Sequence, residues 1–180
     1  MKLEYCSNNL TLRILNENYT NQVLDFYYRN RSYFDMYEAD KPDNFYTPEF
    51  ISNLLRSEYN AFTLGKYARF FLFDKNYPDT IIGTVSFSDI KKGAFKSCLI
   101  GYKIDHDFQR MGYARKMLNM ALKIMVIDGD MHRIEAYISL DNKPSASLVQ
   151  KLGFINEGTA YSYVCINGIW QDHLRYVYIS

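Results

Sequence analysis

Apolar residues alternate with polar ones, or gather in short aromatic-rich runs, along much of the chain, which is the pattern of half-buried β-strands. It predicts strands over residues 10–15, 68–73, 81–87, 97–104, 132–139, 154–166 and 170–179. Asn167-Gly168 separates the last two strands and is a strong hairpin signal, because both residues tolerate a positive φ.

Apolar residues at helical spacing predict helices over residues 18–33, 48–59, 114–128 and 144–152. The third helix has the clearest pattern, with one apolar face made by Met117, Leu118, Ala121, Leu122 and Met125. The predicted element order is therefore β-α-α-β-β-β-α-β-α-β-β. Strand–helix–strand crossings between hairpins indicate an α/β (α+β) fold in which helices cover one mixed sheet.

The composition is that of an ordinary soluble domain. The chain has 180 residues without repeat or linker, which predicts a single domain over residues 1–180. The formal net charge is +1 with no long basic run, so we expect no nucleic-acid partner. The first residues lack the apolar core of a signal peptide, and no apolar run approaches the ~20 residues that cross a bilayer. We therefore expect no membrane partner and a cytoplasmic location.

The cysteines and histidines do not indicate a metal centre. Cys6, Cys98 and Cys165 are far apart and lack CxxC spacing, so neither a disulfide framework nor a zinc site is expected. Each cysteine is predicted to be buried or half-buried. His106 lies between two aspartates, but without further ligands at a regular spacing this run is typical of a loop surface.

Residues 104–114 run from a predicted strand through a loop into a helix, and they are the first candidate for chemistry. Such a loop directs main-chain N–H groups toward one point, and the helix adds its positive dipole end. A phosphate or pyrophosphate fits there, and Gly112 and Ala114 allow close approach. By itself the segment is equally compatible with a plain strand–helix junction.

Several motifs together identify a family. Gln109-Arg110-Met111-Gly112-Tyr113-Ala114 resembles the pyrophosphate loop [RQ]-x-x-G-x-[GA] of the GNAT acetyltransferases. Ile100-Gly101-Tyr102-Lys103-Ile104 is similar to the strand that pairs with the pantetheine arm. Asn142-Lys143-Pro144-Ser145, Lys151-Leu152-Gly153-Phe154 and Gly168-Ile169-Trp170-Gln171-Asp172 match later motifs in the same order. The set is most similar to the branch related to ribosomal-protein N-terminal alanine acetyltransferases.

The resemblance implies a GNAT fold, with a mixed, mostly antiparallel sheet flanked by about four helices, and acetyl-CoA as co-substrate. It implies that the main chain of Tyr102 and Ile104 contacts pantetheine. The residues implied to wrap the pyrophosphate are Gln109, Arg110, Met111, Gly112, Tyr113 and Ala114. Relatives often have glycine where Arg110 stands. Asn142 matches an asparagine that contacts the cofactor arm, although it is also a favoured helix N-cap.

The catalytic residues depart from the family pattern. Many relatives carry a glutamate where Leu99 stands, and other branches use a tyrosine acid at the position of Val149. Glu135 is the nearest candidate base, followed by Asp89, although either side chain can equally be solvated or ion-paired. Ser145 matches a serine near the cofactor sulfur and can protonate the departing thiolate, or it is a solvated first-turn serine.

A missing base favours an acceptor amine of low pKa. A peptide α-amine has a pKa near ~7.7–8.0 and a lysine amine near ~10.4, so the α-amine needs little help to lose its proton. The first hypothesis is therefore acetyl transfer by direct attack of a protein N-terminal amine on the thioester. The alternatives are a polyamine, aminoglycoside or amino-sugar acetyltransferase, and a catalytically silent acyl-CoA-binding sensor.

Two further segments bear on the acceptor. A group of acidic residues lies between the first helices: Asp35, Glu38, Asp40 and Asp43. It mildly favours a cationic substrate, or it is simply part of a solvated loop. The aromatic-rich hairpin over residues 161–178 forms either a dimer surface or one side of the acceptor site. The expected assembly is a monomer or a homodimer.

Overall fold

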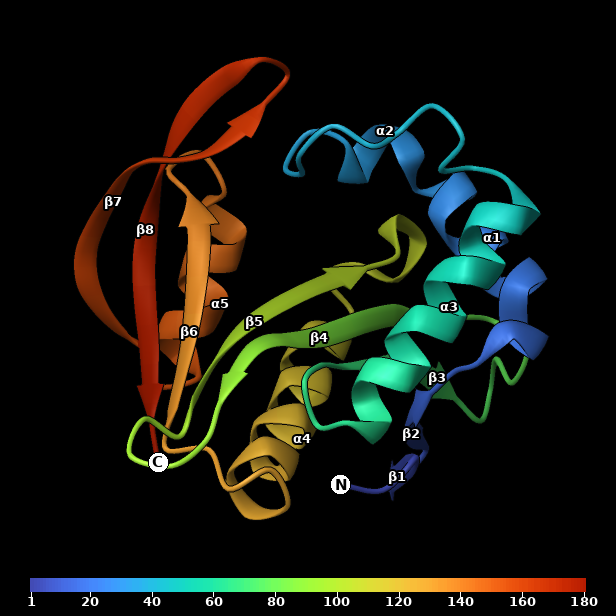
Figure 1. The fold of residues 1–180 in the computed structure, drawn as a ribbon, viewed down its shortest axis with the longest axis horizontal. Coiled ribbons are helices and arrows are strands. Elements are labelled where there is room, and N and C mark those ends of the chain that lie inside the picture. Colours follow the sequence, from blue (N-terminus) through green and yellow to red (C-terminus); the bar gives the residue numbers. More distant parts are fainter.

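An eight-stranded sheet extends through the chain, and the computed structural model describes all of residues 1–180 (Figure 1). The strand order is β1-β2-β3-β4-β5-β6-β8-β7. The strands are β1 (Glu4–Ser7), β2 (Leu10–Ile14), β3 (Ala68–Asp74), β4 (Gly83–Lys91), β5 (Ser97–Ile104), β6 (Arg133–Ser139), β7 (Ile155–Ile166) and β8 (Ile169–Ile179). All neighbouring pairs are antiparallel except β5 and β6, which are parallel. The predicted mixed, mostly antiparallel sheet is confirmed.

Helices cover both faces of the sheet. They are α1 (Thr20–Arg29), α2 (Arg31–Phe34), α3 (Pro48–Thr63), α4 (Tyr113–Ile127) and α5 (Lys143–Lys151), with short 3-10 turns at Glu17–Tyr19 and His106–Phe108. The larger core, 26 buried residues, packs the apolar face of α4 against the inner strands. The smaller core, 11 buried residues, packs α1 and α3 on the opposite face. None of these helices combines the length and the apolar character that a membrane-spanning helix needs.

The parallel pair is very short. Ser97, Cys98 and Leu99 of β5 are in register with Arg133, Ile134 and Glu135 of β6, and pairing ends there. Beyond this point β6 stays paired with β8 while β5 continues with β4, so the two strands separate (Figure 1). We call this opening the strand fork; its sides are residues 100–104 of β5 and 136–139 of β6.

Most predicted elements are present, with four differences. The strand predicted over residues 81–87 covers Gly83–Lys91 instead. An additional first strand, β1, pairs with β2, although Tyr5 is its one partly buried residue and its alternation is weak. The helix predicted over residues 18–33 is broken at Asn30, whose buried side chain donates to the Phe26 carbonyl at 2.9 Å and is used in tertiary contacts. The next helix extends to Thr63 rather than ending at residue 59.

The hairpin and α4 follow the sequence pattern closely. Asn167 and Gly168 have φ values of 51° and 75°, as a two-residue hairpin turn of the predicted kind requires. The apolar face predicted for α4 is buried. The prediction that every cysteine is at least half-buried is wrong for Cys6, which is exposed at the edge strand, whereas Cys98 is buried and Cys165 intermediate.

Candidate active site

The strand fork leaves one edge of β5 without a partner. The amide of Asp105 donates to the Ile82 carbonyl at 2.9 Å, so Ile104 and Gly83 form a non-hydrogen-bonded pair of the β4–β5 ladder. The N–H and C=O of Ile104 therefore point away from β4, into the fork. By the alternation of an antiparallel ladder, the main-chain groups of Tyr102 do the same. An extended ligand can pair with this edge.

The loop that follows β5 adds a group of free N–H donors. Arg110 and Gly112 have φ values of 59° and 82°, and Gly112 is the N-cap of α4. Alternation of left- and right-handed residues turns successive N–H groups toward one side, which is an anion-binding geometry. The N–H groups of residues 110–115 make no hydrogen bond within the chain, and the first helical bond of α4 is from Lys116 to Gly112. These donors and the helix dipole fit a pyrophosphate.

A buried ion pair holds the start of this loop. The Asp105 carboxylate is fully buried and accepts from Arg29 Nε at 2.6 Å, from Asn30 Nδ2 at 2.9 Å and from the Asp107 amide at 3.0 Å. The Asn30 side-chain oxygen accepts from the His106 amide at 2.8 Å. The break between α1 and α2 thus supplies the side chain that fixes the end of β5. Arg29 and Asn30 were not predicted from the sequence, because contacts across 75 or more residues leave no local signal.

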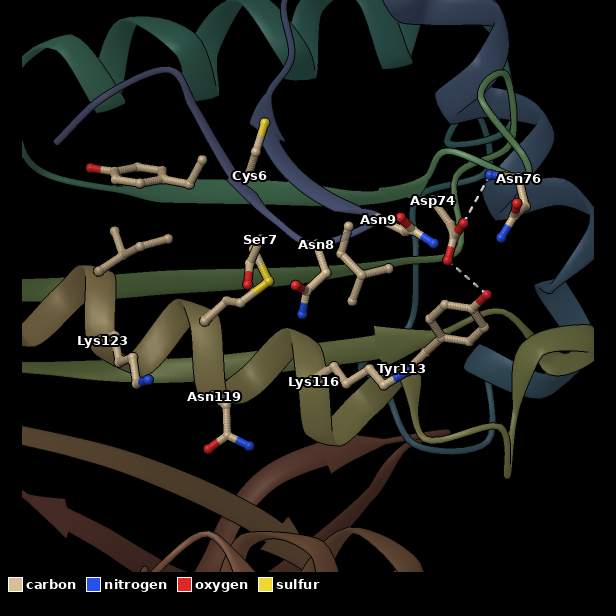
Figure 2. Close-up of a pocket in the computed structure, with 14 residues that line it drawn as sticks. Cys6, Ser7, Asn8, Asn9, Asp74, Asn76, Tyr113, Lys116, Asn119 and Lys123 are labelled. Carbon is tan, nitrogen blue, oxygen red and sulfur yellow. Dashed lines mark hydrogen bonds between the residues drawn. The ribbon is translucent and has the colours of Figure 1, made fainter.

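A second group of contacts fixes the end of the loop. Tyr113 is buried, and its hydroxyl donates to the buried Asp74 carboxylate at 3.1 Å (Figure 2). The Phe108 ring packs edge-on against Tyr113 and Tyr77, with ring centroids 5.8 and 5.1 Å apart. The side chain of Tyr113 therefore faces the sheet, and its amide remains with the free donors at the start of α4.

The first turn of α5 lies beside the fork. The Asn142 side chain accepts from the Ser145 amide at 3.2 Å, so it is the N-cap of α5. The cap uses the side-chain oxygen of Asn142 and leaves its amide NH2 available. Asn142 can therefore be both the helix N-cap and a donor to the cofactor arm. The Tyr102 hydroxyl donates to the Ser145 carbonyl at 3.4 Å. Burial raises the pKa of Tyr102 to about 12, so this phenol stays protonated.

Glu135 lies on the face where the family base is missing. It is in register with Leu99 across the parallel pair, so both side chains point to the same face of the sheet. The carboxylate accepts from Arg133 Nε at 2.8 Å and from the Tyr137 hydroxyl at 3.2 Å, and 19% of its side chain is exposed. The Tyr137 ring stacks on Tyr163 with centroids 4.0 Å apart. Glu135 is thus at the closed end of the fork, beside an aromatic surface.

The other candidate acids are less well placed. Asp89 is exposed, in the irregular part of the β4–β5 pair between Ser88 and Lys91. Val149, at the position of the tyrosine acid in other branches, is fully buried. The Asp105, His106 and Asp107 side chains have ligand atoms within 4.8 Å of one another, but the contacts to Arg29 and Asn30 already occupy Asp105.

The predicted acidic loop lies over the helix-α1 face of the fork. Glu38 pairs with Lys103 Nζ at 2.5 Å and with Lys41 Nζ at 3.1 Å, and Lys41 also pairs with Asp35. Lys103 is on β5, with its ammonium 5.0 Å from the centre of the Tyr27 ring. Burial lowers the pKa of Lys103 from 10.5 to about 8. Much of the loop's negative charge is therefore matched by lysines.

A separate cavity of about 700 Å³ lies away from the fork, between the β1–β2 turn and the outer face of α4 (Figure 2). Lys116, Asn119 and Lys123 line it from the helix, opposite the turn at Asn8. Tyr113 is the one predicted site residue among its lining residues. The remaining predicted residues are at the fork and its loop.

Comparisons with known proteins agree with this geometry. A family model described as an acetyltransferase (GNAT) domain matches residues 9–155. The [ribosomal protein uS5]-alanine N-acetyltransferase of Escherichia coli is 30% identical over 173 residues, covering 96% of this chain and 89% of that protein. The crystal structure of the ribosomal-protein-S5-alanine acetyltransferase from Vibrio fischeri has a TM-score of 0.92 at 29% identity, covering 99% of this chain and 97% of that one. A ribosomal L7/L12 α-N-protein acetyltransferase in complex with coenzyme A shares the fold, with a TM-score of 0.87 at 22% identity over 96% and 95% of the two chains.

Proposed function

The chain belongs to the GNAT acetyltransferase family, and from that premise we propose that its acceptor is the α-amine of a protein N-terminus. The enzyme is an acetyl-CoA-dependent N-acetyltransferase. The observation that carries the acceptor proposal is the similarity, along nearly the whole chain, to relatives named for alanine N-acetylation of a ribosomal protein. The family resemblance seen in the sequence is confirmed by the same matches.

The cofactor has a defined set of partners in this proposal. The pantetheine arm pairs with the main chain of Tyr102 and Ile104 along the free edge of β5. The pyrophosphate accepts from the N–H groups of the loop and of the first turn of α4, in the segment Gln109, Arg110, Met111, Gly112, Tyr113 and Ala114. The Asn142 amide NH2 adds a donor from α5. The support for this assignment is that the N–H groups of residues 110–114 have no acceptor in the chain, whereas the Gln109 amide donates to the His106 carbonyl at 3.4 Å.

The reaction is direct attack of a neutral amine on the thioester carbon. The fork positions the thioester, and a main-chain N–H of β5 donates to the carbonyl oxygen as negative charge develops there. Glu135 takes the proton that the amine loses, directly or through water. Two of the lone-pair positions on this carboxylate are occupied by Arg133 and Tyr137, which leaves others free. Ser145 relays a proton from solvent water to the departing thiolate, so the serine hydroxyl is regenerated and CoA leaves as the thiol.

The pKa of the acceptor supports this choice of substrate. An α-amine, with a pKa near ~7.7–8.0, is substantially neutral at pH 7.5, whereas a lysine side chain near ~10.4 is almost entirely protonated. A base that is already ion-paired to Arg133 is therefore sufficient for an α-amine. It is a poor arrangement for a lysine side chain.

The test is a titration with acetyl-CoA by calorimetry, followed by an assay of free-thiol release. The acceptors are ten-residue peptides beginning with alanine, the same peptides with a blocked α-amine, and the small amines spermidine and glucosamine. We expect acetyl-CoA binding and thiol release that depends on a free α-amine. Equal turnover of the blocked peptide would contradict the acceptor, turnover of only the small amines would establish the small-molecule alternative, and binding without turnover would establish the silent sensor.

A further inference from the structure

One short segment of the acidic loop contacts both β5, on one side of the strand fork, and the β7–β8 hairpin, which follows β6 in the sheet order. Glu38 pairs with Lys103 on β5 at 2.5 Å, and two residues later the Asp40 carboxylate accepts from the Asn167 amide, at the tip of the β7–β8 hairpin, at 3.2 Å. We call residues 38–40 the bridge. Figure 1 shows the loop after α2 and the tip of the hairpin approaching each other above the open end of the fork.

The two ends of the bridge are held unequally. The Glu38–Lys103 pair is about one-fifth exposed on each side, is joined by Lys41, and has the Phe34 ring 5.3 Å from Lys103 Nζ. The contact from Asp40 is a single hydrogen bond between exposed residues. One such bond shifts an equilibrium by roughly two- to tenfold, so the Asp40 end opens readily while the Glu38 end remains in place.

The bridge is far enough from Glu135 that only a long acceptor can reach it. Lys103 is four residues beyond Leu99 along β5, a distance of about 13 Å. On β8 the partner of Glu135 is Val177, and Asn167 is ten residues from it, a distance of at most about 33 Å. An acceptor whose amine is at Glu135 therefore reaches the bridge only if it continues for several residues. A dipeptide ends short of it, and an extended chain of about ten residues passes it.

We propose that the Asp40–Asn167 contact is a latch that closes over the flexible N-terminal segment of a protein acceptor, so that Asp40 determines specificity for a long, unfolded chain end. This inference rests on the proposed function and names the form in which the acceptor enters. In this proposal a short acceptor does not reach the bridge, whereas an extended peptide lies between the bridge and the stacked Tyr137 and Tyr163 rings. The latch is a feature of binding and takes no part in proton transfer.

The kinetic test compares the variants Asp40→Ala, Asp40→Asn and Asp43→Ala on two acceptors, an alanine-initiated decapeptide and the dipeptide amide of its first two residues. Asp40→Ala removes the acceptor oxygen, Asp40→Asn keeps an oxygen but removes the charge, and Asp43→Ala removes a charge from the same loop. We expect Asp40→Ala to lower kcat/KM about fivefold for the decapeptide, through KM, and to leave the dipeptide unchanged. Both other variants remain within twofold of wild type. Equal losses on both acceptors, or equal losses in all three variants, overturn the latch.

Hydrogen exchange of the Asn167 amide gives a readout that does not need turnover. We expect this amide to exchange about fivefold faster in Asp40→Ala than in wild type, and in wild type to slow further when the acetylated decapeptide and CoA are added. An Asn167 amide that exchanges equally in both proteins overturns the latch. If wild type acetylates small amines but no peptide, the proposed acceptor fails, and a difference in exchange at Asn167 shows separately whether the contact forms.

Discussion

Arg110 occupies a backbone conformation that suits glycine, and replacing it tests how the pyrophosphate loop is built. Its φ is 59°, in the left-handed region, while its side chain is exposed. An L-residue there costs about 1–2 kcal/mol, and glycine avoids this cost. Glycine also makes the unfolded chain more flexible, which costs about 0.5–1 kcal/mol. Arg110→Gly is therefore expected to stabilise the protein by about 0.5–1 kcal/mol.

The same substitution has an opposite effect on cofactor binding. It removes a positive charge from the proposed pyrophosphate site, and an exposed charge pair contributes about 0.2–1 kcal/mol, so we expect the Kd for acetyl-CoA to rise roughly 1.4- to fivefold. Arg110→Ala is the matched control, because it removes the charge and keeps the strained Cβ. We expect alanine to weaken binding as much as glycine does, without the gain in stability.

Urea unfolding of the three proteins without cofactor measures the first effect, and calorimetric titration with acetyl-CoA measures the second. For a chain of 180 residues, the expected stabilisation corresponds to a Tm rise of about 1–4 °C in Arg110→Gly. Equal unfolding free energies for the glycine and alanine variants would refute the strain argument. Unchanged cofactor affinity in both would refute the placement of Arg110 beside the phosphates.

Three further predictions concern the base, a buried lysine and the loop support. Glu135→Gln is expected to lower kcat about 10²-fold with an unchanged Kd for acetyl-CoA. Glu157→Gln alters the other carboxylate on Arg133 and should change kcat less than threefold, so equal losses in steady-state assays contradict a base at Glu135. The pKa of Lys103 is lowered to about 8 in the folded protein, so above that pH the unfolded chain binds more protons. Urea unfolding should show the stability of wild type rising from pH 8 to 9.5 relative to that of Lys103→Met, and parallel plots of stability against pH for the two proteins contradict the prediction. Tyr113→Phe removes a donor from the buried Asp74 carboxylate, so the unfolding free energy is expected to fall by about 1–3 kcal/mol. An unchanged unfolding free energy would show that this hydrogen bond does not stabilise the fold.

Much of the fold follows from local patterns in the sequence. The spacing of apolar residues predicts α4, and the Asn167-Gly168 turn predicts the last hairpin, because both depend on residues that are close in the chain. The strand β1 is missed because an edge strand with only Tyr5 partly buried has little apolar signal. The break at Asn30 is missed because its cause is tertiary: the side chain bonds to Asp105, 75 residues away.

The candidate site divides in the same way. The loop residues 109–114 can be found from sequence because main-chain donors need glycine and a helix start at a fixed spacing. The register of Glu135 with Leu99 cannot be found from the sequence, because it depends on which strands are neighbours in the sheet. The ion pair of Glu38 with Lys103 and the contact of Asp40 with Asn167 join positions 65 and 127 residues apart, and each residue alone is typical of a solvated surface. Roles for Ser145 and Asn142 stay predictions.

The short parallel pair has a consequence for the behaviour of the protein in the absence of its co-substrate. A strand with unpaired main-chain groups is a template for joining another chain, and proteins usually place such strands at the outside of a sheet and protect them with charge or a bulge. Here the unprotected stretch, residues 100–104, lies in the interior of the sheet order, between β4 and β6. A pantetheine arm paired with it as proposed would cover the same main-chain groups that an incoming strand needs. We therefore expect protein stripped of CoA to self-associate more readily, so that light scattering on heating begins at a lower temperature than in protein saturated with CoA.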